Sequence, residues 1–540
     1  MPNTLYFGDN LEILRRYIAD ESVDLIYLDP PFNSNQSYNV LFAEHDGTKA
    51  AAQVQAFGDT WEWDEAAARA YQEVVEAGEQ VSLALQAFRT MLGSSDMLAY
   101  LAMMAPRLIE LRRALKPTGS LYLHCDPTAS HYLKLLLDSV FRPENFRNEI
   151  IWLRTTPKGL MTKRLPQNHD VILAYQKTNS ATWNAGAVFA AYDQDNLDDK
   201  TEEKYSLRDP DGRRYQLTAL INPNRNRPNL TYEFLGVTRV WRWTKQRMQA
   251  AYDAGLIVQT EPGRVPRFKR YLDEQRGRPS GSVWTDIAPV NSQAQERLGY
   301  PTQKPEELLR RIVRLSTNPQ DVILDPFCGC GTAIAAAEAL DRQWIGIDIT
   351  HLAINLVRHR LYGSFGNISY QVIGEPKDLS GAEELASSVP YQFQWWALGL
   401  VGARPAEQKK GADHGIDGRL FFHDEGASGS TKQIIFSVKA GKASVAHVRD
   451  LVGVLDREKA AIGVLISMQE PTREMRKEAA SAGFYSSPWG TNHPRAQLLT
   501  IAELLSGQRV DYPPTQANVT LKKAPKATKP GGKQSKLFRD

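Results

Sequence analysis

The stretch Val23-Asp-Leu-Ile-Tyr-Leu-Asp-Pro-Pro-Phe32 decides the fold, and the rest of the chain is organised around it. Its apolar run, Leu25 to Leu28, predicts a buried strand of a parallel sheet. The two prolines that follow cannot continue a strand, because proline has no N–H to donate and a fixed φ. Asp29 and the carbonyl of Pro30 are therefore expected at the carboxyl end of that strand, where open α/β sheets bind their ligands.

The residues after this strand suit one kind of substrate, a planar group that bears an NH2. Asp29 and the Pro30 carbonyl can both accept hydrogens from the amine, Pro31 holds the backbone rigid, and Phe32 can cover the flat face. The alternative is a strand that ends in an ordinary turn, with Asp29 as its cap. These residues alone leave both interpretations open.

The size and composition of the chain indicate a globular protein with several domains. Its 540 residues correspond to roughly two to four domains. No apolar run reaches the ~18 residues of a membrane span, and no signal peptide opens the chain, so no membrane partner is expected. A reducing cytoplasm is expected from the few, unpaired cysteines. The three cysteines, Cys125, Cys328 and Cys330, show no paired spacing and argue against disulfides or structural zinc. The net charge of +3 neither supports nor excludes nucleic acid.

Residues 1–154 alternate between predicted strands and helices. Leu5 to Phe7 predicts a strand, the turn Gly8-Asp9-Asn10 follows it, and a helix leads on to the Asp29 strand. An acidic, alanine-rich insert over residues 44–95 interrupts this order and is expected to be helical and to lie near Asp29. Further elements are expected as a helix over 97–115, a strand over 120–124, a helix over 128–140 and a strand over 150–153. The pattern predicts one half of a doubly wound α/β domain.

Residues 155–290 have a different composition. Arginines, prolines, asparagines and aromatic residues interleave there, for example in Asn222–Pro228, Trp241–Arg247 and Arg264–Arg270. Basic residues mixed with aromatic ones suit phosphate contacts combined with stacking on bases. A solvated charged face is the alternative for any single arginine, but the region as a whole favours binding of nucleic acid.

The α/β alternation resumes in residues 291–374 with a strand that ends at Asp325, a turn with Gly329 and Gly331, and a strand that ends at Asp348. The glycines allow the backbone to approach a cofactor at a helix N-terminus, and Asp348 can hold ribose hydroxyls. Nicotinamide cofactors use the same pattern, with a third glycine that is absent here. The Asp325 carboxylate would repel a pyrophosphate but can accept from an ammonium group, which favours S-adenosylmethionine.

With these motifs the chain resembles the amino-methylating DNA methyltransferases. Asp29 to Phe32 is similar to their catalytic motif, the turn that begins at Asp325 is similar to their cofactor motif, and Asp348 takes the place of their ribose-binding acid. The catalytic motif precedes the cofactor motif, as in the permuted beta group, whose intervening segment recognises the target sequence. The resemblance covers roughly residues 1–365. It implies a Rossmann-like, S-adenosylmethionine-dependent fold with an inserted recognition region.

The resemblance also extends to two further cofactor motifs. Gly299–Pro305 resembles the tenth motif of the group, whose following helix closes over the cofactor, and Gly8–Asn10 resembles the motif that contacts the adenine of the cofactor. The cofactor contacts implied in this way are Asp9, Asn10, Thr302, Gln303, Lys304, Pro305, Asp325, Pro326, Phe327, Gly329, Gly331, Thr332 and Asp348.

The reaction that the resemblance implies is methylation of an exocyclic amine in double-stranded DNA. Hydrogen bonds to Asp29 and the Pro30 carbonyl would localise the nitrogen lone pair, which then attacks the sulfonium methyl in line. The base must leave the duplex to reach the site, and Phe32 would stack on it. Aspartate at the first position of the motif implies adenine N6, in restriction–modification or phage defence. Cytosine N4, or an RNA substrate, is the alternative.

The last part of the chain indicates a second domain over residues 390–512, after a polar linker over 375–389 and before a basic, disordered tail over 513–540. An aspartate on one strand, Asp417, and a lysine on the next, Lys439, are typical of a metal-dependent phosphodiesterase, with Mg2+ as its metal. This stretch resembles the Mrr-like branch of the restriction-endonuclease fold. Ser437 stands where that family has Glu or Gln, and a missing carboxylate weakens metal binding unless Asp413 or Glu407 compensates.

The second domain therefore has two interpretations, a nuclease and a module that only binds DNA or a partner. For the whole protein, the candidate protein partners are a second copy of the chain, which would give a homodimer, and restriction or defence proteins.

Overall fold

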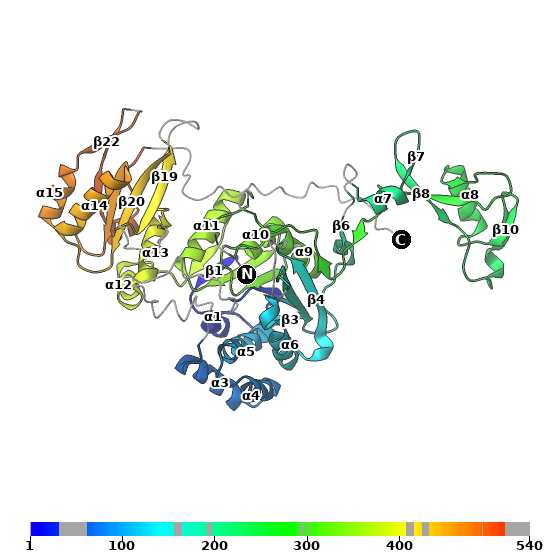
Figure 1. Cartoon of the computed structure of the whole chain (residues 1–540), viewed down its shortest axis with the longest axis horizontal. Helices are drawn as coiled ribbons and strands as arrows, with labels where there is room; N and C mark the ends of the chain where they lie inside the picture. The colour runs from blue at the N-terminus through cyan, green and yellow to red at the C-terminus, as the bar shows by residue number, and fades with distance from the viewer. Residues whose placement is uncertain are drawn as a thin grey trace. The chain divides into compact units, whose positions relative to one another are not determined.

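The computed structural model describes residues 2–31, 62–155, 165–190, 192, 197–291, 294, 296–298, 300, 302–406, 415–423, 431–488 and 490–513. The chain divides into two compact units, one formed by Ala185–Gly281 and the other by the rest of the chain. The larger unit contains a nine-stranded sheet and a five-stranded sheet (Figure 1). No helix within the described ranges is long and apolar enough to span a membrane.

The nine-stranded sheet is predominantly parallel. Only β5 runs antiparallel to its neighbours among the strands described. The sheet has the order β14 (Val283–Trp284), β4 (Phe146–Leu153), β5 (His169–Gln176), β3 (Leu115–Cys125), β2 (Val23–Leu28), β15 (Val322–Asp325), β16 (Gln343–Asp348), β1 (Thr4–Phe7) and β17 (Gln371–Ile373). All six residues of β2 are buried, as expected for a central parallel strand.

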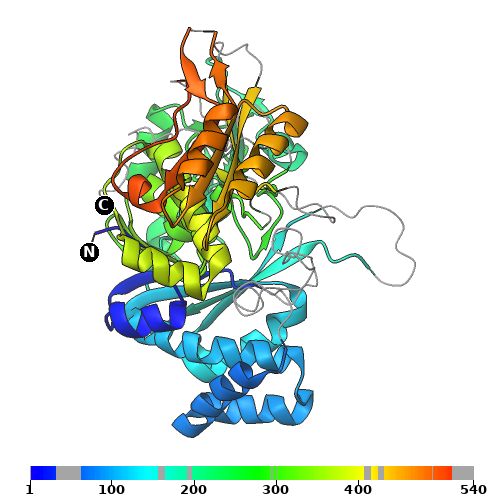
Figure 2. The ribbon, with the colours of Figure 1, turned by 90° about the vertical axis from the view of Figure 1, so that its left-hand side faces the viewer.

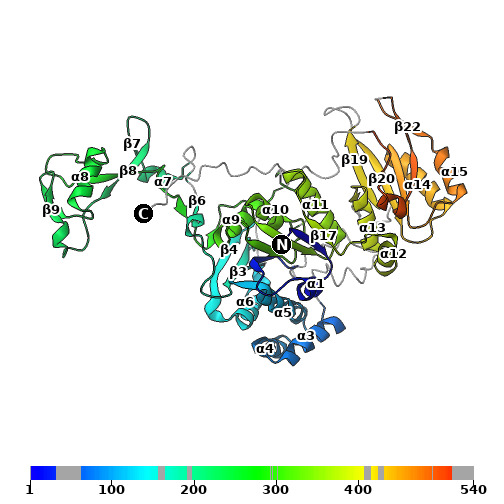
Figure 3. The same cartoon turned by 180° about the vertical axis from the view of Figure 1, so that it is seen from behind.

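Helices cover both faces of this sheet, which confirms the doubly wound α/β fold. Figures 1 and 3 show one group of helices on one face and a second group on the other. The first group is α1 (Asn10–Tyr17), α5 (Asp96–Ala114) and α6 (Pro127–Phe141), and the second is α9 (Glu306–Ser316), α10 (Thr332–Ala339) and α11 (His351–Phe365).

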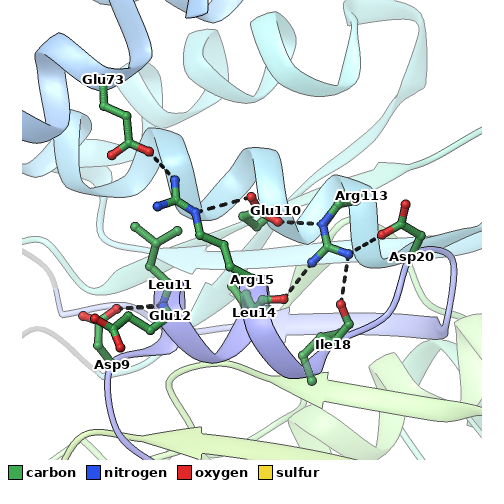
Figure 4. A network of polar contacts seen from close by, with 10 residues as sticks. All are labelled: Asp9, Leu11, Glu12, Leu14, Arg15, Ile18, Asp20, Glu73, Glu110 and Arg113. Carbon is green, nitrogen blue, oxygen red and sulfur yellow. Dashed lines mark hydrogen bonds and ion pairs between the residues drawn. The ribbon is translucent and has the colours of Figure 1, made fainter.

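Two arginines hold α1 against its neighbours (Figure 4). Arg113 of α5 donates to the carbonyls of Leu14 and Ile18 at 2.7 and 2.9 Å, and so satisfies carbonyls that the end of α1 leaves unpaired. Arg15 of α1 lies 3.5 Å from Glu110 of α5 and also pairs with Glu73. These contacts fix the helix that directly follows the Gly8–Asn10 turn.

The described part of the predicted insert is helical. It consists of α3 (Glu65–Ala77) and α4 (Gln80–Leu92), which pack on α5 and α6 (Figure 2, blue). Trp63 packs edge-on against Tyr71, and the Arg89 guanidinium lies 4.9 Å from the Trp63 ring centre. The remainder of the insert, with Trp61, lies outside the described residues.

The smaller unit, Ala185–Gly281, has its own core and mostly short strands. Trp241, Phe234 and Met248 lie at the centre of this core. Its elements are β6 (Phe189–Ala190), α7 (Asp199–Lys204), β7 (Leu207–Arg208), β8 (Arg214–Ala219), β9 (Thr231–Phe234), β10 (Val237–Val240), α8 (Lys245–Asp253), β11 (Ile257–Val258), β12 (Arg267–Tyr271) and β13 (Arg278–Pro279). The predicted bounds of the recognition region, 155–290, were too wide, because β5 and β14 belong to the nine-stranded sheet.

The C-terminal part of the larger unit contains the five-stranded sheet, in the order β18-β19-β20-β21-β24. The linker predicted over 375–389 is wrong in most of its length, because Ala382 and Ala386 of α12 are buried in the core of this part. Its elements are α12 (Leu379–Ser388), α13 (Pro390–Leu400), β18 (Arg404–Pro405), β19 (Gly418–His423), β20 (Thr431–Lys439), α14 (Val445–Glu458), β21 (Ile462–Ser467), α15 (Arg473–Ser481), β22 (Phe484–Ser486), β23 (Asn492–Pro494), β24 (Ala496–Thr500) and α16 (Ile501–Leu505). The predicted tail beyond residue 513 lies outside the described residues.

Candidate active site

Four neighbouring parallel strands each bring an aspartate to the same edge of the large sheet. Asp29 follows β2, Asp325 ends β15, Asp348 ends β16, and Asp9 follows β1. Because parallel neighbours end at a common edge, residues from the beginning and the end of this domain meet there. All four aspartates line one cavity of about 140 Å³.

Most of the predicted site residues line this cavity. Asp9, Asn10, Asp29, Pro30, Pro31, Thr302, Gln303, Lys304, Asp325, Pro326, Phe327, Gly329, Thr332 and Asp348 do so. Gly331 and Pro305 are not among the lining residues, and Phe32 lies outside the described residues.

Asp29 forms an ion pair across the cavity. The Lys304 ammonium donates to Asp29 Oδ2 at 2.5 Å, and the two side chains are only 11% and 17% exposed. The Asp29 carboxylate therefore already engages an N–H donor, which is the interaction expected of it with a substrate amine. The resemblance assigns Lys304 to the cofactor, and its contact with Asp29 was not predicted.

The two acids of the cofactor motifs are buried. Burial raises the pKa of Asp348 to about 6, against the hydrogen bonds it accepts from Thr350 and Gly329. The Thr350 N–H and hydroxyl donate to Oδ1, and the Gly329 N–H donates to Oδ2, all at 2.9 Å. Burial also raises the pKa of Asp325 well above its ordinary value, and the charges of Asp29 and Asp348 add to this effect.

The glycine turn requires both of its glycines. Gly331 has a φ of +72°, and a Cβ built there would lie 2.8 Å from Val357 Cγ2. Gly329 has a φ of +49°, and its Cβ would lie 3.1 Å from the Tyr300 ring. These positive φ values favour glycine. The backbone can therefore pass close to whatever occupies the cavity.

Two arginines that the sequence did not indicate, the buried Arg360 and the partly buried Arg107, hold the glycine turn and the Gly8–Asn10 turn. Arg360 of α11 donates to the Cys330 carbonyl at 3.1 Å and to the Thr332 hydroxyl at 2.8 Å. Arg107 of α5 donates to Asp9 Oδ2 at 2.8 Å and to Asn10 Oδ1 at 2.6 Å. Both arginines come from helices distant in the sequence from the turns, so no local pattern could identify them.

Comparison with known proteins shows the family to which the chain belongs. Residues 23–358 match the sequence model of a family described as DNA methylase. The chain belongs to this DNA methylase family. It is 27% identical over 365 residues to the type II methyltransferase M.EcaI of Enterobacter cloacae, which covers 67% of this chain and 69% of that protein. It is 25% identical over 355 residues to the Mod subunit of the type III restriction-modification enzyme StyLTI of Salmonella typhimurium, covering 63% of this chain and 50% of that protein.

Two further comparisons are more limited. Over 81 residues, 15% of this chain and 27% of the relative, the DNA methylase is 46% identical to the DNA adenine methyltransferase YhdJ of Escherichia coli. Among solved structures, a DNA modification methylase of Thermus thermophilus complexed with S-adenosyl-L-methionine is 16% identical with a TM-score of 0.34, and the match covers 69% of this chain and 99% of that one.

The C-terminal part of the DNA methylase matches a second family over residues 390–506, described as NACHT-associated inactive Restriction Endonuclease 1. The predicted pair lies there at adjacent strand ends, with Lys439 Nζ 3.9 Å from Asp417 Oδ2. Asp417 Oδ2 also accepts from the Val438 N–H at 2.6 Å. No group of three or more His, Cys, Asp or Glu side chains able to hold a metal occurs within the described ranges, and Asp413 and Glu407 lie outside them. The described residues of this part do not fit a Mg2+ site.

A buried polar chain also reaches the cavity of the DNA methylase. The Tyr27 hydroxyl, which belongs to a lining residue, lies 3.0 Å from His124 Nδ1, and His124 Nε2 lies 3.0 Å from Asp170 Oδ2. Burial raises the pKa of Tyr27 well above its ordinary value, and the charge of Asp29 contributes to the shift. No sequence pattern indicated this polar chain, because its members lie on three strands, β2, β3 and β5.

Proposed function

We propose that this DNA methylase transfers a methyl group from S-adenosylmethionine to the exocyclic N6 of adenine in double-stranded DNA. The observation that carries the proposal is the shared cavity: Asp29 of the catalytic motif lines it together with Asp325 and Asp348 of the cofactor motif. The names of the relatives, type II methyltransferases and the Mod subunit of a type III restriction-modification enzyme, support a role in restriction–modification. A role in phage defence and a cytoplasmic location are further parts of the proposal.

The residues of the cavity fit S-adenosylmethionine. Asp325 offers a carboxylate to the cofactor ammonium, and Asp348 has further lone pairs that can accept from ribose hydroxyls. Gly329 keeps the turn free of a side chain where it lines the cavity, and Gly331 lets the turn pack closely against Val357 of α11. When bound, the cofactor supplies an electrophilic methyl group.

Asp29 and the Pro30 carbonyl would activate the amine. An exocyclic amine is a poor nucleophile because its lone pair is delocalised into the ring, and two acceptors on its hydrogens would localise that lone pair. The amine loses one proton when it gains the methyl group, and Asp29 is placed to accept that proton. The ion pair with Lys304 supports this role, because in it the carboxylate engages an N–H donor inside the cavity.

We propose that Ala185–Gly281 contacts the DNA and that the target base is flipped out, with Phe32 stacking on it. Several arginines of this unit are exposed and form no ion pair with a described carboxylate: Arg225, Arg227, Arg239, Arg242, Arg247 and Arg267. Such side chains suit phosphates, and their binding would depend on salt. Trp241 is not available to stack on a nucleic-acid base, because it is fully buried in the core of the unit.

For residues 390–512 we propose a module that binds DNA or a partner protein without cleaving DNA. The lack of a described metal-ligand group and the match to an inactive endonuclease family support this interpretation. We also propose that the protein forms a homodimer and that it associates with restriction or defence proteins.

Sequencing of host DNA for modified bases, with and without the gene, tests the main proposal. We expect N6-methyladenine at one defined motif that disappears when the gene is removed. N4-methylcytosine in its place would keep the role of Asp29 and overturn the choice of adenine. Methyl transfer by the purified protein to RNA and not to duplex DNA would overturn the choice of substrate.

A further inference from the structure

We infer that Gln392, on helix α13 of the C-terminal part, is a positioning residue of the cofactor site. The C-terminal part would then be a working component of the methyltransferase. This inference rests on the proposed function, in which Asp348 holds the ribose of the cofactor.

The side chain of Gln392 reaches the loop that follows Asp348. Gln392 is 9% exposed. Its Oε1 accepts from the His351 N–H at 3.1 Å, and its Nε2 donates to the Ile349 carbonyl at 3.3 Å. Ile349 lines the cavity. The amide supplies a donor and an acceptor at once, which a carboxylate cannot do when ionised.

The loop held by Gln392 in turn holds Asp348. Thr350, between the two backbone groups that Gln392 contacts, donates to Asp348 Oδ1 from its N–H and its hydroxyl, both at 2.9 Å. A displacement of residues 349–351 would therefore rotate the Asp348 carboxylate. Orientation of a binding group by a supporting hydrogen bond is a general way in which an outer residue tunes a site.

Other contacts surround the same loop and helix α11, which follows it. The Asn355 amide of α11 donates to the Trp395 carbonyl of α13 at 3.3 Å. The His351 ring stacks on Phe7 with 3.7 Å between ring centres, and its Nδ1 lies 3.3 Å from Glu375 Oε1. Phe7 directly precedes the Gly8–Asn10 turn. The C-terminal part thus contacts the loop after Asp348 and helix α11 directly, and His351 at the start of α11 contacts the strand that leads to the Asp9 turn.

A matched pair of variants in the full-length protein tests the inference. Gln392→Ala removes both hydrogen bonds to the loop. Gln394→Ala makes the same change two residues along the same helix, at a side chain that forms no hydrogen bond with a described residue. Calorimetry with S-adenosylmethionine gives the Kd of each variant, and steady-state kinetics give KM for cofactor and DNA separately.

We expect Gln392→Ala to raise the Kd and KM for S-adenosylmethionine about five- to tenfold, from the loss of hydrogen bonds to a buried loop. The KM for DNA should stay close to that of the wild type, and the lost hydrogen bonds should lower the thermal unfolding midpoint by no more than about 4 °C. Gln394→Ala should match the wild type throughout. Gln392→Glu should bind the cofactor at least as weakly as Gln392→Ala, because its carboxylate would face the Ile349 carbonyl.

Equal cofactor affinity in Gln392→Ala and Gln394→Ala would overturn the inference. So would an equal loss of cofactor and DNA affinity in Gln392→Ala together with a fall of the unfolding midpoint well beyond about 4 °C, since that pattern indicates a purely structural contact. Failure of the proposed function is distinguishable: the wild type would not bind S-adenosylmethionine, or Asp348→Asn would bind it as tightly as the wild type.

Discussion

The large-sheet cavity and the Asp417–Lys439 pair use the same kinds of side chain in different surroundings. In the cavity, Asp29 pairs with Lys304 at 2.5 Å, and three more aspartates line the same space. In the C-terminal part, Asp417 lies 3.9 Å from Lys439, and the described residues offer no group of metal ligands around them. The difference shows that the same pair of side chains at strand ends can stand alone or can line a cavity with further acids from neighbouring strands, and we propose a reactive site only for the second arrangement.

The largest effect is expected from Asp29→Ala. Removing an acceptor aimed at the reacting group typically costs a hundredfold to a thousandfold or more. We expect radiolabelled methyl transfer to duplex DNA to fall by about a thousandfold, while calorimetry shows S-adenosylmethionine bound within a few-fold of wild-type affinity. Asp29→Asn, which keeps the shape but loses the charge, serves as the control and should retain part of the activity. Wild-type turnover in Asp29→Ala would contradict the catalytic role of this side chain.

A smaller effect is expected from a change of pH on the affinity for S-adenosylmethionine. The pKa of Asp348 is raised to about 6, so the carboxyl becomes protonated as the pH falls through that value. Ribose hydroxyls donate to an ionised carboxylate, so binding requires loss of that proton. Cofactor affinity should therefore fall by up to about tenfold per pH unit below 6. Asp325, whose pKa is also raised, should act in the same direction.

Calorimetric titrations between pH 5 and 8, a window of about one to two units on either side of that pKa, check this expectation. Asp348→Asn should bind the cofactor weakly at every pH. Its affinity should also lack the pH dependence that residue 348 contributes in the wild type. A wild-type affinity that is constant across the window would contradict the assigned contact.

The sequence was informative where structure is determined locally. Leu25–Leu28 is an apolar run cut off by two prolines, and it forms the end of β2; Asp325 and Asp348 end strands β15 and β16 for similar local reasons. The parallel order of these strands then brings their terminal acids together. For this reason the fold class and the aspartates at the strand ends could be predicted without coordinates, whereas lining residues such as Asn10 and Thr302–Lys304 were implied by the family resemblance.

The sequence was uninformative where a residue acts through a distant partner. Arg107 holds the Gly8–Asn10 turn from α5, and Arg360 holds the Cys330–Thr332 turn from α11. Gln392 reaches the loop after Asp348 from the C-terminal part. Composition over a long region also misplaced the domain limits. The strand His169–Gln176 lies within a region whose overall composition is basic and irregular, yet seven of its eight residues are buried in the large sheet.

The smallest effect, a modest loss of stability, is expected from Asp417→Ala. This variant tests the role of the Asp417–Lys439 pair. The variant removes the acceptor of the Val438 N–H, bonded at 2.6 Å, so stability should fall by about 1 kcal/mol as measured by denaturant unfolding. Methyl transfer should be unchanged. Neither the wild type nor the variant should cleave duplex DNA with Mg2+, because the described residues contain no group of three or more side chains able to hold the metal.

Asp417→Asn separates the structural contribution of this side chain from a catalytic one. Its amide oxygen can still accept from Val438, so most of the lost stability should return, whereas a metal ligand would lose its negative charge in both variants. Mg2+-dependent cleavage by the wild type that disappears in both variants would mean that the C-terminal pair is a second active site. Loss of stability in Asp417→Ala alone, without cleavage in any protein, would show that an aspartate at a nuclease-like position here serves only the fold.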